Sequence, residues 1–180
     1  MHEANIIAAV ERWLNQFVIG LNLCPFARRV AVQGGIRYKV TDASTEAQLS
    51  AALEDELNLL LSNPAIETTL LIHPQVLDEF YDYNDYLSVV EDMLQQSTFD
   101  GVFQVASFHP DYQFAGTHPD DAENYSNRTP YPLLHLLRED SVTAAVDSHA
   151  DIDSIPVNNL QLLNRLDRDV LQQMWRSCLS

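Results

Sequence analysis

The order of the apolar segments limits the fold of this chain more than any other feature. Residues 36–40 alternate between apolar and polar side chains, and 68–72 is a short, nearly all-apolar run of the kind found in strands covered on both faces. A further strand is predicted at 102–108. Between these runs, apolar residues recur every three or four positions in 49–61 and 87–94, which is typical of amphipathic helices. This order favours parallel pairing through right-handed crossovers, so we predict an α/β fold with a small, mostly parallel sheet flanked by helices.

Additional helices are predicted at both ends of the chain. Helical spacing of apolar residues runs from about Glu3 to Gly20, and Pro25 suits the first position of a short helix that Gly34-Gly35 would end. The leucines of 133–137 suggest a helix that begins at Pro132 and continues through residue 146, with a strand at 142–146 as the alternative. Residues 160–175 are predicted to be helical with a break near Asp167.

Length and charge narrow the class of protein. A chain of 180 residues with 46% hydrophobic content predicts a single globular domain over residues 1–180. The net charge of −16 disfavours binding to nucleic acid or to anionic membranes, and no apolar run approaches the roughly 20 residues that span a bilayer. The first ten residues lack the pattern of a secretion signal, so we expect a cytoplasmic protein whose two cysteines are reduced.

One polar segment, residues 108–139, is unusually rich in groups that carry chemistry. It contains three histidines, five carboxylates, two arginines and four prolines between two apolar runs. Unstructured loops longer than roughly 12–15 residues are uncommon in compact domains and are often functional or disordered. This loop is too aromatic to be typical of disorder, and we therefore predict a functional site within it.

Two predicted strands end in the same dipeptide, His73-Pro74 and His109-Pro110. If these strands are parallel and adjacent, both imidazoles lie at the carboxyl edge of the sheet, where open α/β folds bind their ligands. His109 is then a candidate general acid or base, and Arg128 a candidate anchor for an anion, because its planar fork suits carboxylates and phosphates. The alternative is that each group satisfies its neighbours and holds the loop in shape.

Cys24 is a second candidate catalytic residue. It would occupy the N-cap of the short helix that begins at Pro25, where amide dipoles and the nearby Arg28 and Arg29 favour the thiolate. The alternative is a buried packing role beside Leu23, since free cysteine is among the most often buried residues.

The remaining candidates would bind a substrate or a metal ion. Glu123 could act with His109 and Cys24 in catalysis, and His109, Asp121 and His135 supply metal-binding atoms, although their spacing matches no known metal motif. The candidate substrate-binding residues are Arg128, Arg28, Tyr112, Asn124 and Tyr125. The tyrosines could either wall a pocket or pin the loop to the sheet. No cofactor or oligomeric state is predicted.

Two functional hypotheses follow from these residues. The first is an enzyme that acts on a small anionic molecule through a histidine, arginine and carboxylate site in loop 109–135. The second is a non-catalytic ligand-binding or protein-interaction domain whose polar loop is rigid and satisfies its own groups. A pocket lined by three or more of the polar residues favours the first, and a loop without a cavity between them favours the second.

Three segments together resemble a known family. Leu23-Cys24-Pro25-Phe26-Ala27, FHPDYQFAG at 108–116 and AENYSNRTPYPLLHLLRE at 122–139 are similar, in the same order, to signature segments of a bacterial family of unknown function with relatives in photosynthetic eukaryotes. The resemblance covers the whole chain. It implies no activity, substrate or cofactor, and no functional residue is carried over from it.

Overall fold

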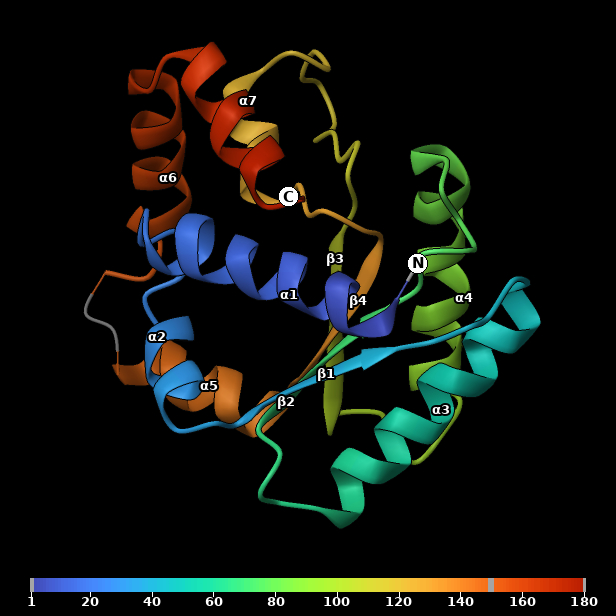
Figure 1. Cartoon of the computed structure of the whole chain (residues 1–180). Helices are drawn as coiled ribbons and strands as arrows, with labels where there is room; N and C mark the ends of the chain where they lie inside the picture. Colours follow the sequence, from blue (N-terminus) through green and yellow to red (C-terminus); the bar gives the residue numbers. More distant parts are fainter. Residues whose placement is uncertain (1, 149–150, 180) are drawn as a thin grey trace.

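The structure is a computed structural model that describes residues 2–148 and 151–179. A sheet lies at its centre, with α1 crossing one face and α3 and α4 packed on the other side (Figure 1). The elements are α1 (Glu3–Trp13), the π-helix η1 (Leu14–Ile19), α2 (Ala27–Val32), β1 (Ile36–Val40), α3 (Glu46–Ser62), β2 (Thr68–Ile72), α4 (Phe80–Gln95), β3 (Phe103–Phe108), the 3-10 helix η2 (Ala122–Ser126), β4 (Leu133–Arg138), α5 (Glu139–Ser148), α6 (Ser154–Arg165) and α7 (Arg168–Ser177).

The sheet has the strand order β1-β2-β4-β3. β1 and β2 pair in parallel, whereas β4 is antiparallel to both β2 and β3. β1, β2 and β3 therefore point in one direction, and β4 runs between β2 and β3 in the other. The predicted α/β fold is confirmed, but the two strands that end in His-Pro are not adjacent, because the chain turns back after β3 and inserts β4 between them.

Residues 133–137 form a strand and not the predicted helix. Leu133, Leu134 and Leu136 are fully buried, and they alternate between the two faces of the sheet. A strand that is buried on both faces carries apolar residues in succession, so periodicity does not distinguish it from a buried helix. The helix begins only at Glu139, and residues 142–146 are part of α5.

Each face of the sheet has its own apolar core because side chains alternate along a strand. On one face, Leu70, Ile72 and Leu133 pack with residues of α1 and η1. On the other face, Leu71, Leu134 and Leu136 pack with residues of α3 and α4. Predicted site residues on opposite faces of the sheet are therefore separated by the sheet and cannot form one site.

The terminal helices agree with the sequence predictions except at the start of α2. This helix begins at Ala27 and its N-cap is Phe26, so Pro25 is not its first residue and the predicted N-cap position of Cys24 is wrong. Helical structure runs from Glu3 to Ile19, and α2 ends before Gly34, whose φ of 68° lies in the left-handed region that glycine favours. The predicted break near Asp167 separates α6 from α7, and the Asp167 carboxylate accepts a hydrogen bond of 2.8 Å from the Asp169 amide. Within the described residues, no helix is both long and apolar enough to cross a membrane.

Candidate functional site

His73 and His109 lie at the same edge of the sheet, as their positions after two strands of one direction require. Both side chains are fully buried. Tyr83 of α4 fills the space between them, with its ring centroid 5.7 Å from that of His73 and 5.2 Å from that of His109. The Tyr83 hydroxyl accepts a hydrogen bond from the Phe108 amide (3.0 Å) and donates one to the Leu133 carbonyl (2.9 Å). The Tyr83 ring therefore fills the space between the two imidazoles at this edge of the sheet.

The imidazole of His109 is held by backbone groups through both of its nitrogens. Nε2 lies 3.2 Å from the Leu77 carbonyl oxygen, to which it donates, and Nδ1 accepts from the Asp111 amide at 3.0 Å. Burial lowers the pKa of His109 below its ordinary value. His109 is thus a neutral side chain that supports the loop before α4, and it has no ring nitrogen left for a substrate.

His73 supports the same loop from the neighbouring position. Its Nδ1 donates to the Val76 carbonyl at 2.9 Å, whereas Nε2 has no hydrogen-bond partner among the described residues. Burial lowers the pKa of His73 to about 4. The two histidines hold consecutive carbonyls, those of Val76 and Leu77, and Leu77 has a left-handed φ of 58°.

Asn124 pins the long loop after β3 from the inside. This fully buried side chain accepts hydrogen bonds from the Phe114 amide and the Thr117 hydroxyl, both at 3.0 Å, and donates one of 2.8 Å to the His118 carbonyl. Asp121 closes the same turn, because its carboxylate accepts from the His118 amide at 2.7 Å. The loop is therefore ordered by its own polar groups.

We expect Asn124→Ala to lower the free energy of unfolding by about 3 kcal/mol, because it leaves buried polar groups of the loop without partners. Urea denaturation measures this loss. Asn84→Ala, at an exposed position of α4, is the control and should change stability by less than about 0.5 kcal/mol. Equal effects of the two substitutions would contradict the role assigned to Asn124.

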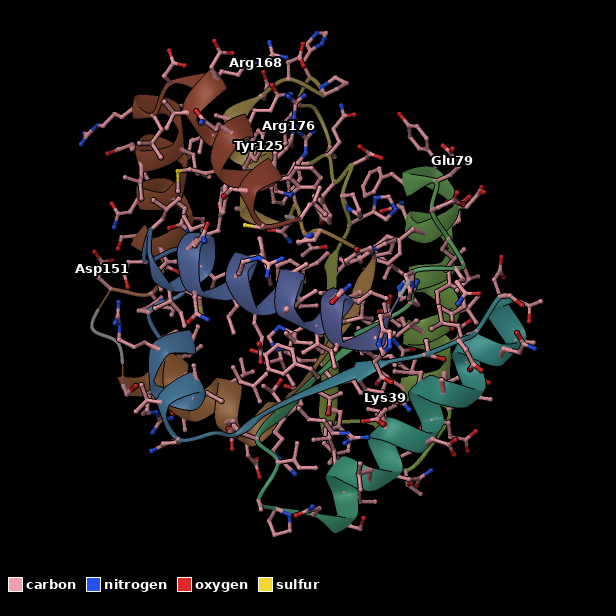
Figure 2. The ribbon with its side chains drawn as sticks, viewed as in Figure 1. Lys39, Glu79, Tyr125, Asp151, Arg168 and Arg176 are labelled. Carbon is pink, nitrogen blue, oxygen red and sulfur yellow. The ribbon has the colours of Figure 1, made fainter. Side chains whose placement is uncertain are left out.

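Arg128 also holds the loop. Its Nε donates to the Tyr112 carbonyl at 3.1 Å, one Nη donates to the Pro119 carbonyl at 2.6 Å, and the guanidinium lies 5.0 Å from the centroid of the Tyr125 ring. Tyr125 is buried and stacks on Phe17 of η1. Figure 2 shows Tyr125 next to α7, with Arg168 farther out at the beginning of that helix. Arg128 therefore points its donors at the loop's own backbone.

Tyr112 and Arg28 lie away from a common site. The Tyr112 ring packs 5.2 Å from Phe80 and 5.0 Å from Phe114. Arg28 is exposed, and one of its Nη atoms lies 3.5 Å from the Ile19 carbonyl oxygen. Of the five candidate substrate-binding residues, Tyr112, Asn124, Tyr125 and Arg128 thus hold the loop or its packing, and Arg28 lies on the surface.

The three candidate metal-binding residues are not brought together. His109 lies on the side of the sheet that faces α4, whereas His135 lies on the opposite side, where its Nε2 donates to the Thr68 hydroxyl at 2.9 Å and its ring packs against Phe108. Asp121 is in the turn at His118. Across residues 2–148 and 151–179, no three His, Cys, Asp or Glu side chains are arranged to hold a metal ion.

A cavity of about 450 Å³ lies beside the loop and contains two of the predicted catalytic residues. We call it the η1–α6 cavity, after two of the elements that form its wall. The residues that line it are Val18, Leu23, Cys24, Phe108, Phe114, Glu123, Ser126, Asn127, Ile155, Pro156, Asn159, Leu160 and Leu163. A second hollow of about 350 Å³ between α4 and β3 contains none of the predicted site residues. The η1–α6 cavity is therefore the candidate site.

Local structure explains how the wall of the η1–α6 cavity is built. Helix η1 ends at Ile19, and its C-cap is Gly20, where a Cβ would collide with the Gln16 carbonyl. The chain then turns through Asn22, whose φ of 54° is left-handed. This turn brings Leu23 and Cys24 to the cavity. The Asn159 side chain of α6 donates to the Leu23 carbonyl at 2.8 Å and fixes the opposite wall to the turn.

Most polar groups of this wall are already used. The Ser126 hydroxyl lies 2.9 Å from the Glu123 carbonyl oxygen and 3.0 Å from Oδ1 of Asn127, and Nδ2 of Asn127 donates to the Ser107 carbonyl at 3.0 Å. In contrast, the Glu123 carboxylate and the Cys24 thiol have no hydrogen-bond or ionic partner among the described residues. Both residues are half-buried. The carboxylate of Glu123 and the thiol of Cys24 are therefore the groups of the lining residues that remain available to bind a ligand.

Sequence reasoning missed the residues that α6 contributes. Ile155, Asn159 and Leu163 line the cavity and follow one another at intervals of four, which places them on one side of α6. This spacing could have identified an inward-facing stripe. It could not have identified its partner, because the contact joins positions more than 130 residues apart, such as Asn159 and Leu23.

The chain belongs to the family described as protein of unknown function (DUF1415), whose model matches residues 5–173. No curated protein and no solved structure matches the chain. The family membership thus confirms the resemblance found in the sequence, and a functional inference has to come from the site itself.

Proposed function

We propose that this chain binds a small, largely apolar molecule in the η1–α6 cavity. The observation that carries the proposal is a cavity of about 450 Å³ whose lining is mostly apolar and includes Cys24 and Glu123, whose thiol and carboxylate have no partner in the described part of the chain. Pockets for small molecules commonly have volumes of about 300–1,000 Å³, with apolar walls and a few polar groups. Apolar surface supplies affinity in such a site, and the polar ends orient the ligand.

This proposal develops the second of the two hypotheses from the sequence. Loop 109–135 satisfies its own polar groups through His109, Asn124 and Arg128, which supports a scaffold that positions Glu123 at the cavity. Catalysis by His109, Cys24 or Glu123 stays a prediction. The polar groups of the loop that were expected to hold an anion are directed at backbone carbonyls instead.

Hexanol is a suitable neutral probe for the proposed function. We expect it to shift the methyl NMR resonances of Val18, Leu23 and Leu163 in a saturable manner, because these residues line the cavity. Leu160→Trp should weaken this binding by about tenfold or more, since Leu160 lines the cavity and is partly exposed, so a larger side chain there would occupy the space of the probe.

Val157→Trp is the matched control, because Val157 is an exposed residue of the same helix that does not line the cavity. This variant should bind hexanol as the unsubstituted chain does. Cavity methyl resonances that do not respond to hexanol, or that respond equally in both tryptophan variants, would contradict the proposed function.

A further inference from the structure

We infer that the η1–α6 cavity selects ligands that carry a cationic amine on an apolar body. This inference rests on the proposed function and names the class of molecule that the cavity takes. It starts from Glu123, which lines the cavity and whose carboxylate has no hydrogen-bond or ionic partner among the described residues. A carboxylate only accepts hydrogen bonds when ionised, so the partner that suits it is a donor, and a charged donor gives the stronger bond.

The lining contains no counter-charge that would serve an anion. Among the described residues, none of the lining side chains is a lysine or an arginine. Arg128 lies five positions after Glu123 in the sequence, but it does not line the cavity. Its Nε and one Nη donate to the Tyr112 and Pro119 carbonyls. Arg28, near Cys24, is exposed on the surface. An anionic ligand would therefore meet the Glu123 carboxylate without a compensating cation.

The groups around the cavity, taken together, also favour the binding of a cationic ligand. Phe108 and Phe114 contribute aromatic rings to the wall, and the faces of such rings attract ammonium groups. The first turn of α6 borders the cavity and carries a partial positive charge at its N-terminus, but the N-cap position of this helix is the acidic Asp153. The net charge of −16 adds a general attraction for cations.

Three six-carbon probes, whose apolar chains differ by at most one methylene group, separate charge from apolar burial: hexylamine, hexanol and hexanoate. We expect the chain of 180 residues at neutral pH to bind hexylamine about tenfold or more tightly than hexanoate, with hexanol between them, because hydrogen bonds between charged groups are stronger than neutral ones. Methyl NMR titrations of Val18, Leu23 and Leu163 measure the three dissociation constants.

Glu123→Gln tests the residue directly, since it keeps the shape of the side chain and removes its charge. It should weaken hexylamine by about tenfold, strengthen hexanoate and leave hexanol unchanged. Glu54→Gln makes the same charge change at an exposed position of α3 and controls for the general attraction. This control should leave the order of the three probes as it is.

The outcomes separate this inference from the proposed function. If no probe shifts the cavity resonances, the proposed function fails. If hexanol binds but hexylamine binds no better than hexanoate, the cavity is a binding site and the amine selectivity is refuted. Equal weakening of hexylamine and hexanol in Glu123→Gln would also refute it, because Glu123 would then shape the cavity and not recognise charge.

Discussion

Acidification from pH 6.5 to about 4 is expected to remove about 6 kcal/mol of folding stability through two histidines, the fully buried His73 and the half-buried His135. Burial lowers the pKa of each to about 4, from an ordinary value of 6.5. The difference of about 2.5 pKa units, at about 1.4 kcal/mol per unit, corresponds to about 3 kcal/mol for each histidine at pH 4, where the ring in the folded chain is half protonated. This is a large share of the roughly 5–15 kcal/mol by which domains of this size are stable.

The sign follows from proton binding in the two states. Between pH 6.5 and about 4, the unfolded chain takes up a proton on each histidine, whereas the folded chain keeps both rings neutral. The stabilising contribution of the neutral rings is therefore complete above pH 6.5 and falls as the pH is lowered towards 4. Urea denaturation across this range measures the loss.

Variants are needed to measure how much of the pH-dependent loss of stability comes from the histidines, because the many carboxylates of the chain also titrate in acid. His135→Gln can still donate to the Thr68 hydroxyl but does not titrate, so its stability should depend on pH by about 3 kcal/mol less than that of the unsubstituted chain. His118→Gln, at an exposed position of the loop, is the matched control for the substitution. Parallel profiles for His135→Gln and the unsubstituted chain would refute the prediction.

Replacement of Arg138 by methionine is expected to cost about 3 kcal/mol of stability. The Arg138 guanidinium donates to the carbonyls of Leu60 at 2.7 Å, Asn63 at 3.2 Å and Ile66 at 2.9 Å, at the point where α3 ends and the chain leads into β2. A cation at this position also complements the negative end of the helix dipole. Methionine keeps the apolar stem but leaves these carbonyls without their donor.

Two other substitutions show whether the fork of the guanidinium is responsible. Arg138→Lys keeps the charge but cannot reach three carbonyls with fixed geometry, so its stability should lie between those of the methionine variant and the unsubstituted chain. Arg29→Met, at an exposed position of α2, should change stability by less than about 0.5 kcal/mol. A methionine variant at Arg138 that is as stable as Arg29→Met would contradict this account.

Local patterns in the sequence predicted most of the elements but not the sheet order. The alternation at 36–40 and the apolar run at 68–72 became β1 and β2 within the predicted bounds. The leucines of 133–137 were interpreted as helical because a strand covered on both faces has no alternation to reveal it. This error also hid the insertion of β4 between β2 and β3, which separates the strands that precede His73 and His109.

The candidate site was predictable in part for a related reason. Cys24 and Glu123 were recognised as reactive residue types, and both line the η1–α6 cavity. His109 and Arg128 were selected by the same reasoning, yet their donors are used by the backbone carbonyls of Leu77 and Tyr112. Residue type shows what a side chain can do, whereas the partner that uses it depends on tertiary contacts. The wall formed by α6 depends on such contacts entirely.

The central claim is that the η1–α6 cavity is open to small molecules, and alkylation of Cys24 by iodoacetamide tests it most directly. Cys24 lines the cavity, and the chain's other cysteine, Cys178, is fully buried. The account predicts that Cys24 reacts in the folded protein and that hexylamine, at concentrations that saturate the cavity resonances, slows this reaction in proportion to the bound fraction. A Cys24 thiol that does not react in the folded chain, or that reacts at the same rate with the probe bound, would contradict it.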